Sequence, residues 1–502
     1  MTLYEAFLQG ASRAPGQPAV IDLGTTLTFA QLRDNIGRLS NYYQAEIPKG
    51  SVVAMLSGNG WVFAQTIFAV SNSGCPLVLL QPSETDESLL RDLRELRVGV
   101  LLVGSSLVAR ANDLVRREKL PVTVIEIEKK RAGEYDTSFR ALPDRPVKDT
   151  DTVLIARVAE TPLHRKYSAF NHKQVITAAS APKRAYRLAG NDRILTTMNW
   201  AHPFALTHGL LLPLFTGAAC VADPEAPSVE EFVDYLAKNR VTRFAGAPKF
   251  YFQLLSYCAA RKYPLPGVKS ITLGMGTLSL VLRKTYQLLK IPVVRCYGRP
   301  EAVWTLAMDD VEGALDIENT RSKPLHGVRM AVLTEDGEEI PGPGRREGRL
   351  AVMAETLATT YCAPERAPNE NFRGTWLHTD EIARLEGDGE ELTVAVLGKV
   401  TDMITRGGAY LSAKRIDVAA QKVQGVEDAA GFVRIDKNHE PHFAVAVVMQ
   451  GARINEKDLL DRIREELPDE FHPETVHLID VLPRDAFESV NRQALQRQFS
   501  SG

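Results

Sequence analysis

The feature that most constrains the fold is a repeated alternation of helix-like segments and short apolar runs. Residues 28–46 carry apolar side chains at helical spacing, and the runs SVVAMLS, PLVLLQP and VGVLLVG follow, separated by helix-like segments. This alternation favours a parallel sheet with crossover helices. Further strands are expected at 152–155, 193–197, 218–222, 241–245, 270–274 and 292–296.

The later part of the chain has a different pattern. Residues 346–385 contain shorter strand-like runs split by turn residues, which indicates an antiparallel section. Beyond residue 398 the order helix, strand, strand, helix, strand is typical of a small α+β domain. A chain of 502 residues is too long for one compact core. We therefore predict an α/β protein with a large N-terminal domain of mixed sheets and flanking helices, and a small C-terminal domain.

Composition excludes several classes of function. The net charge is −2, so bulk charge attracts neither nucleic acid nor an anionic membrane. We find no run of about 18 apolar residues that could span a membrane and no secretory signal. Five scattered cysteines without CxxC spacing argue against a disulfide framework or a zinc site. A cytoplasmic protein without nucleic-acid or membrane partners is expected.

Six segments, in the right order, resemble the adenylate-forming superfamily of acyl- and aryl-CoA synthetases, nonribosomal peptide adenylation domains and firefly luciferase. One match would be weak, but six in order cover nearly the whole chain. They are TLTFAQLRDNIGRLSNYY (26–43), HPFALTHGLLLPLFTGA (202–218), VVRCYGRPEA (293–302), WLHTDEIARLEGDGE (376–390), LGKVTDMITRGGAYLSAKRID (397–417) and LPRDAFESVNRQAL (482–495).

The resemblance implies a division into residues 1–397, a hinge at 398–402, and a mobile small domain at 403–502. It also implies a reaction in two halves. A carboxylate attacks the α-phosphate of ATP to give acyl-AMP and pyrophosphate, and a thiol or amine then displaces AMP. ATP or AMP and Mg²⁺ would be the cofactors. A small carboxylate or acyl group would be the ligand, with CoA, a carrier protein or a pathway enzyme as the partner.

The phosphate loop of the family aligns with ARVAETPLHRKY (156–167), which we expect between a strand and a helix N-terminus. Family loops use glycines because backbone N–H groups must approach phosphate oxygens closely. Here Pro162 removes one N–H and Glu160 adds a negative charge. Thr161 and Lys166 are retained. Lys166 is either the loop lysine of the family or a solvated lysine on an exposed loop.

Two further segments align with nucleotide contacts of the family. The segment YGRPE keeps Tyr297, which would stack on adenine, together with Gly298 and Glu301, which would help to hold Mg²⁺. Pro300 replaces a threonine that contacts phosphate, and proline has no side-chain donor.

The segment HTDE aligns Glu381 with an aspartate that binds the ribose hydroxyls in the family. An alignment displaced by one residue would use Asp380 instead. Lys399 replaces an arginine after the hinge glycine, so the charge is kept but the planar fork is lost.

The last segment aligns Ser489 with the lysine that bridges carboxylate and α-phosphate in the family. Serine supplies no positive charge for the developing transition state. Glu488 takes the place of the preceding glycine, and Arg484 and Arg492 are expected to be surface charges.

The acyl pocket is expected to be lined from HPFAL and LGMGT. His202 aligns with a gating histidine of the family, although a structural role is equally open. Phe204 and Met275 favour an apolar or aromatic carboxylate. Gly274 and Gly276 indicate either a backbone close to a ligand or a tight strand end.

Three hypotheses follow. The chain is a degenerate homologue with weak or no adenylation that keeps an acyl-binding, second-half acyl-transfer or scaffold role in a biosynthetic pathway. Alternatively, it is an active ATP-dependent carboxylate ligase with unusual motifs, or a purely structural partner. The altered phosphate loop, the proline and the serine all fall on phosphate contacts, which favours the first hypothesis.

Overall fold

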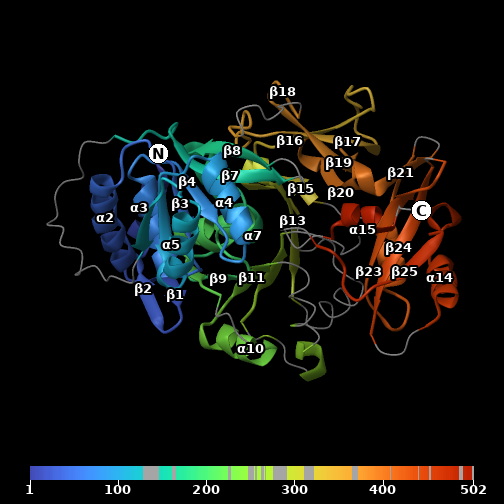
Figure 1. Ribbon diagram of the computed structural model, residues 1–502, viewed down its shortest axis with the longest axis horizontal. Helices are drawn as coiled ribbons and strands as arrows, with labels where there is room; N and C mark the ends of the chain where they lie inside the picture. Colours follow the sequence, from blue (N-terminus) through green and yellow to red (C-terminus); the bar gives the residue numbers. More distant parts are fainter. Residues whose placement is uncertain are drawn as a thin grey trace.

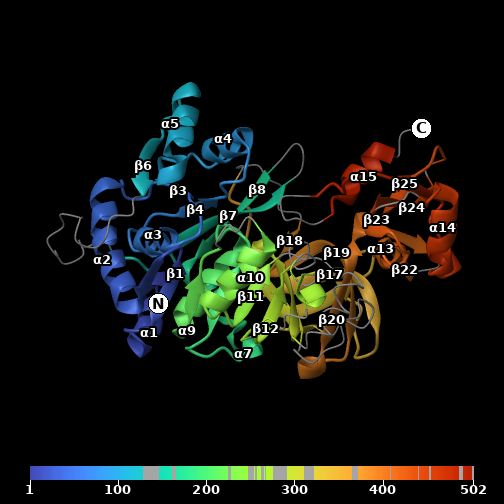
Figure 2. The ribbon, with the colours of Figure 1, turned by 90° about the horizontal axis from the view of Figure 1, so that it is seen from below.

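The computed structural model describes residues 1–127, 146–160, 165–223, 228–246, 254, 257–261, 265, 267–274, 291–309, 322–363, 371–406, 409–438, 440–450, 454–484 and 490–499. The polar segment 128–146 lies almost entirely outside these residues. The N-terminal elements and the C-terminal elements lie at opposite ends of the molecule in both views (Figures 1 and 2).

A six-stranded sheet, counted over the described residues, has the order β6-β5-β3-β4-β7-β8. The strands β3, β4, β5 and β6 pair in parallel, as the alternation predicts, and helices separate them along the chain. Its elements are β3 (Val53–Leu56), α3 (Trp61–Ser71), β4 (Leu77–Leu80), α4 (Asp86–Glu95), β5 (Val100–Gly104), α5 (Val108–Arg117), β6 (Thr123–Ile127), β7 (Thr152–Glu160) and β8 (Arg165–Asn171).

A second sheet of 14 strands, again over the described residues, changes from parallel to antiparallel along its length. The strands β9 to β13 pair in parallel, and from β13 onward the pairing is antiparallel, as expected for residues 346–385. Its strands are β1 (Pro18–Asp22), β2 (Thr25–Thr28), β9 (Arg193–Thr196), β10 (Ala219–Val221), β11 (Arg243–Gly246), β12 (Ser270–Leu273), β13 (Val293–Arg299), β14 (Trp304–Asp309), β15 (Ser322–Pro324), β16 (Arg329–Leu333), β17 (Arg346–Met353), β18 (Phe372–Arg373), β19 (Trp376–Glu386) and β20 (Thr393–Lys399).

Helix starts follow local capping chemistry. Thr28 and Gln31 form a capping box at one helix, and Asn171 and Gln174 form another. No helix among the described residues is both long and apolar enough to cross a membrane. The remaining N-terminal helices are α1 (Leu3–Arg13), α2 (Phe29–Glu46), α6 (His172–Ser180), α7 (Lys183–Tyr186), α8 (Pro203–Ala205), α9 (Leu212–Thr216) and α10 (Val229–Lys238).

The C-terminal elements form sheets of their own. The expected order of helix, strand, strand, helix, strand is confirmed, and a third helix follows it. The elements are β21 (Met403–Arg406), β22 (Ala409–Ser412), α13 (Lys414–Ala420), β23 (Val426–Ile435), β24 (Pro441–Met449), α14 (Glu456–Glu465), β25 (Thr475–Leu478) and α15 (Arg492–Phe499).

Two arginines near the C-terminus are not the surface charges expected from the sequence. The Arg492 side chain is 9% exposed and forms an ion pair with the carboxylate of Asp417. Arg484 is half-buried and lies 2.7 Å from the carboxylate of Asp428. Arg492 therefore holds α15 to α13, and Arg484 holds the segment before α15 to β23, which the charge pattern alone did not reveal.

The expected setting of residues 156–167 is also wrong. Residues 156–160 belong to β7 and residues 165–167 to β8; the two strands pair in antiparallel fashion, and α6 begins only after β8. Tyr167, Ser168 and Phe170 are buried, so this segment gains more from pairing with β7 than from leading directly into a helix. Lys166 therefore lies on a strand, and no helix N-terminus directly follows the loop.

Candidate active site

The site lies where the large sheet changes from parallel to antiparallel, at the hairpin formed by β13 and β14. The turn between them, Pro300–Ala302, is a short 3-10 helix. Val303 and Trp304 follow it with φ values of 55° and 102°, which are strained for such side chains. A Cβ on Gly298 would lie 2.5 Å from the backbone oxygen of Trp304, so only glycine fits there. This tight turn brings Arg299 and Glu301 side by side.

A single arginine engages three carboxylates at this turn. Arg299 donates from Nη2 to Oε1 of Glu301 at 3.0 Å and from Nε to Oε2 at 3.2 Å. Its Nη1 lies 2.9 Å from Oδ1 of Asp380 and 3.4 Å from Oε2 of Glu381. We call these four residues, together with Tyr297, the Arg299 cluster.

Tyr297 completes the cluster from the neighbouring position on β13. Its hydroxyl donates to Oε2 of Glu381 at 2.6 Å. Glu381 pairs across β19 and β20 with Lys399, whose side chain is exposed. The Glu381 side chain is 16% exposed, whereas that of Asp380 is 54% exposed. Of the two alternative alignments, Glu381 is therefore the carboxylate that points into the cluster.

The charges of the cluster shift the pKa values of its members. Burial would lower the pKa of Arg299, but the carboxylates of Glu301, Glu381 and Asp380 raise it well above its ordinary value. Burial raises the pKa of Asp380, yet Arg299 and Lys399 outweigh it and lower the pKa. Burial and the Glu381 carboxylate raise the pKa of Tyr297 well above its ordinary range. The arginine stays charged and the tyrosine stays a hydrogen-bond donor.

The residues present do not fit a magnesium ion held by Glu301, which is the role that the resemblance implies. Glu301 is 1% exposed, and both of its carboxylate oxygens accept hydrogen bonds from Arg299. Mg²⁺ requires oxygen ligands that are free to coordinate it. Within the described part of the chain, no group of three or more His, Cys, Asp or Glu side chains could hold a metal.

Lys166 approaches the same region through an aromatic ring. Its Nζ lies 4.6 Å from the ring centroid of Tyr361, which is a cation–π contact rather than full solvation. Burial and then the charge of Glu301 raise the pKa of Tyr361. The backbone N–H of Ala358 donates to the backbone oxygen of Glu301 at 2.8 Å. The segment around Tyr361 thus connects β8 to the Arg299 cluster.

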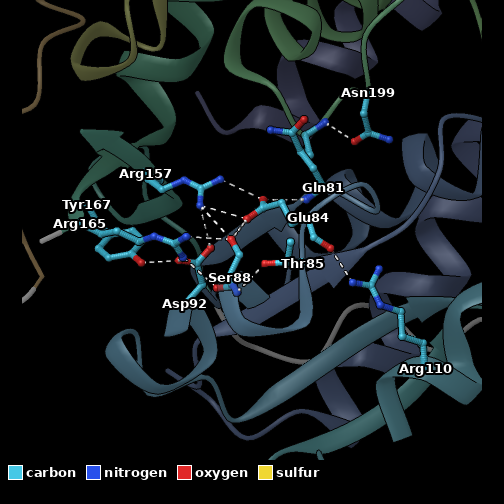
Figure 3. A network of polar contacts seen from close by, with 11 residues as sticks. Gln81, Glu84, Thr85, Ser88, Asp92, Arg110, Arg157, Arg165, Tyr167 and Asn199 are labelled. Carbon is cyan, nitrogen blue, oxygen red and sulfur yellow. Dashed lines mark hydrogen bonds and ion pairs between the residues drawn. The ribbon is translucent and has the colours of Figure 1, made fainter. Parts of the chain in front are cut away.

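A second set of buried charges holds the β7–β8 hairpin to α4 (Figure 3). Arg157 lies 3.0 Å from Glu84, and Arg165 lies 2.6 Å from Asp92. Tyr167 donates its hydroxyl to the same Asp92 carboxylate. We call these five residues the anchor network. They fix the strands β7 and β8 against α4 and the residues just before it.

The described residues expected at the acyl pocket pack against one another through aromatic contacts. A Cβ on Gly274 would lie 2.5 Å from the Phe204 ring. The His202 ring lies 5.1 Å from that of Trp304. Burial lowers the pKa of His202 to about 3, so this histidine is neutral. Trp304 is 5% exposed, and its Nε1–H has no hydrogen-bond partner among the described residues.

A neighbouring histidine is held on both sides. His208 lies 2.8 Å from the hydroxyl of Tyr186 through Nδ1 and 2.6 Å from Oγ1 of Thr305 through Nε2. Burial lowers the pKa of His208 to about 3. This histidine packs against the Phe204 ring and links Tyr186 of α7 to Thr305 of β14.

Four expected site residues lie outside the described residues: Thr161, Met275, Gly276 and Ser489. Of the others, Tyr297, Gly298, Glu301, Glu381 and Lys399 come together, while His202, Phe204 and Gly274 pack together beside Trp304.

The sequence analysis missed two residues of the site, Arg299 and Trp304. Arg299 stands between two retained family positions, and a cation beside an expected magnesium ligand is the signal that could have revealed it. Trp304 gives no such signal, because its strained backbone and unpaired N–H exist only in the folded hairpin.

Comparison with known proteins matches residues 7–362 to the family of AMP-binding enzymes. A feruloyl-CoA synthase from Amycolatopsis sp is 25% identical over 97% of both chains. The anthranilate CoA ligase AuaEII in complex with anthranoyl-AMP has the same fold, with a TM-score of 0.85 at 17% identity over 99% of this chain and 97% of that one. ATP-bound MatB from Rhodopseudomonas palustris also gives 0.85, at 18% identity over 100% and 99%.

Proposed function

This chain belongs to the family of AMP-binding enzymes, and we propose that it is a carboxylate-binding member in which formation of acyl-AMP from ATP is weak or absent. It is homologous to acyl- and aryl-CoA ligases. It keeps an acyl- or aryl-binding, second-half acyl-transfer or scaffold role. Its partner would be CoA, a carrier protein or another enzyme of a biosynthetic pathway.

One observation carries the proposal, namely the bidentate contact between Arg299 and Glu301. The family reaction uses a metal-bound triphosphate, and preorganised positive charge at the phosphoryl group stabilises its transition state. Here the one carboxylate expected to hold the metal is buried and satisfied by a side chain. Pro300 adds no donor at the phosphate, and Ser489 adds no charge.

The ligand class follows from the pocket wall. His202, Phe204 and Trp304 present neutral aromatic surfaces rather than a carboxylate that would bind an α-amino group. An apolar or aromatic carboxylate is therefore favoured over an amino acid. The names of the relatives, feruloyl-CoA synthase and anthranilate CoA ligase, support the same class.

The second candidate function is an active ATP-dependent carboxylate ligase that forms acyl-AMP and then a thioester or amide. It is favoured by Glu381, which keeps one carboxylate oxygen, Oε1, without a partner among the described residues and able to accept ribose hydroxyls. Lys166 lies over the ring of Tyr361, whose segment contacts Glu301, and it could still reach a phosphate.

Carboxylate-dependent exchange of pyrophosphate into ATP separates the two functions. We expect background exchange with a panel of fatty acids, aryl acids such as ferulate, benzoate and anthranilate, and amino acids. Robust exchange with any one of them would establish the active ligase and reject the proposal.

A restoration experiment asks which defect dominates. The double change Ser489→Lys and Glu488→Gly rebuilds the C-terminal segment of the family. We expect pyrophosphate exchange to stay at background, because Arg299 still binds both carboxylate oxygens of Glu301. High exchange in this variant would mean that the serine, and not the arginine, limits adenylation.

We also propose that residues 403–502 form a small mobile domain joined to residues 1–397 by a hinge at 398–402. The separate sheets of the C-terminal elements and the short turn at Val400–Asp402 support this division. Limited proteolysis that cuts first within 398–402 and releases two folded fragments is the expected result.

A further inference from the structure

The Arg299 cluster differs from an inert surface ion pair in its depth and its geometry. The Arg299 side chain is 16% exposed and that of Glu301 is 1% exposed. The guanidinium forms two parallel hydrogen bonds to one carboxylate, which is the strongest arrangement available to this pair. The guanidinium of Arg299 thus places a positive charge directly beside the Glu301 carboxylate.

A divalent ion could bind Glu301 only by displacing this arginine. The guanidinium, in a mostly buried place, would then lose both hydrogen bonds to Glu301 and keep only Asp380 and Glu381 as partners, which is unfavourable. The carboxylate of Glu301 would also have to turn away from Nε and Nη2 together. Arg299 therefore competes directly with a metal.

The cluster nevertheless keeps an open acceptor. Glu381 uses only Oε2 toward Tyr297 and Arg299, and its Oε1 has no partner among the described residues. A carboxylate oxygen of this kind accepts hydroxyl groups such as those of a ribose. The neighbouring Tyr297 is half-buried, with its ring packed against the core and its hydroxyl bonded to Glu381. Lys399, on the strand opposite Glu381, supplies positive charge at the exposed edge.

We propose that Arg299 replaces the divalent cation of this site, so that the protein binds an adenosine monophosphate group, as AMP or an acyl adenylate, without metal and does not bind a metal-bound triphosphate there. This inference rests on the proposed function and names the ligand class of the same site. It requires no chemical step, because the ligand binds already formed.

The test uses the full chain, with AMP and Mn²⁺ as probes. Calorimetry with AMP in EDTA and again in MgCl₂ should give Kd values within about twofold of each other. Titration with Mn²⁺, followed by electron paramagnetic resonance of the free ion, should show no binding that depends on Glu301, with Glu301→Gln as the reference. A tenfold loss of AMP affinity in EDTA, stoichiometric Mn²⁺ binding lost in Glu301→Gln, or no AMP binding in either buffer would overturn the proposal.

Variants of the arginine provide the positive counterpart. In Arg299→Met we expect AMP binding in EDTA to weaken at least tenfold and Mn²⁺ to bind and restore it. Arg299→Lys keeps the charge but cannot engage both oxygens of Glu301, so an intermediate loss is expected. If Arg299→Met binds AMP as tightly as the wild type in EDTA, Arg299 is not the counter-cation.

Arg295→Met is the matched control. Arg295 lies on the same strand, its side chain is 15% exposed, and it pairs with Asp309 instead of with the cluster. It should lose stability without gaining Mn²⁺ binding. If Arg299→Met does not fold, the wild-type measurements alone still decide the proposal. Robust pyrophosphate exchange would reject both the proposed function and this inference, because the exchange requires metal-bound ATP in the site. Background exchange with Glu301-dependent Mn²⁺ binding would reject this inference only.

Discussion

The anchor network and the Arg299 cluster are built from the same residue types, yet their charges are balanced differently. In the anchor network, two arginines face two carboxylates, and the four side chains are between 4% and 15% exposed. In the Arg299 cluster, one arginine faces three carboxylates, and Asp380 is 54% exposed. Two positive and two negative charges cancel, whereas one positive and three negative charges leave −2.

This difference separates a structural network from a binding site. A balanced, buried network has no free hydrogen-bonding group and no uncompensated charge to offer a ligand, and it acts only to hold its elements together. An unbalanced cluster with an open edge keeps acceptors available. The surplus at the Arg299 cluster lies on the side of Asp380 and Glu381, where the charges of Lys399 and Lys414 offset part of it, and so that edge is where a ligand would bind.

The largest expected effect comes from breaking the anchor network. Arg165→Met leaves Asp92 buried without its closest cation, and we expect the free energy of unfolding to fall by about 3–5 kcal/mol. Urea denaturation followed by tryptophan fluorescence measures it. The control Arg33→Met removes an exposed pair with Asp34 and should change stability by less than about 0.5 kcal/mol. Equal effects for the two variants would show that the network is not structural.

The next prediction tests whether the loss of stability in acid comes from the buried neutral histidines or from the carboxylates of the anchor network and the Arg299 cluster. The folded-state pKa of His208 is about 3, against an ordinary 6.5, because it is buried. Between these values the unfolded chain binds more protons, so stability is complete above pH 6.5 and is lost as pH falls toward 3.

In His208→Gln, which can keep both hydrogen bonds, the dependence of unfolding free energy on pH should be less steep by about 1.4 kcal/mol per pH unit between pH 6 and pH 4. Chemical denaturation at several pH values measures the slope. An unchanged slope would assign the acid response to other groups, including the carboxylates of the two clusters.

Two tyrosines give a direct comparison, because each donates its hydroxyl to a carboxylate of its own set. Tyr167→Phe should lower the free energy of unfolding by about 1.5–3 kcal/mol, as expected for a lost hydrogen bond to a buried charge. Tyr297→Phe should cost less stability, about 1 kcal/mol, but should weaken AMP binding about fivefold by releasing Glu381. If Tyr167→Phe changed AMP affinity as much as Tyr297→Phe, the two sets would not be functionally distinct.

The smallest expected effect concerns the exposed edge of the Arg299 cluster. Lys399→Met should weaken AMP binding by about two- to threefold, and this difference should vanish at high salt because exposed charges are screened. Calorimetry at two ionic strengths measures it. A salt-independent loss would indicate a direct, buried contact instead.

Much of the fold could be predicted from the sequence alone. The apolar runs and helical spacings predicted β3, β4 and β5 with their helices, because period and apolarity are local properties of the chain. The order of six family-like segments predicted which residues would meet, and Tyr297, Glu301 and Glu381 do lie in one cluster. Residue type at each aligned position also predicts which phosphate contacts would be missing, and that stays a prediction.

Other features were decided only by the tertiary structure. Residues 165–171 form the strand β8 because they pair with β7. Local propensity alone did not distinguish a strand from a loop at these residues. Arg492 is buried because Asp417, distant in sequence, neutralises it. Arg299 became the centre of the site for the same reason: the sequence determined which charges the chain carries, while folding decided which of them meet, since Coulomb energy depends on the distance and burial that only the packed structure sets.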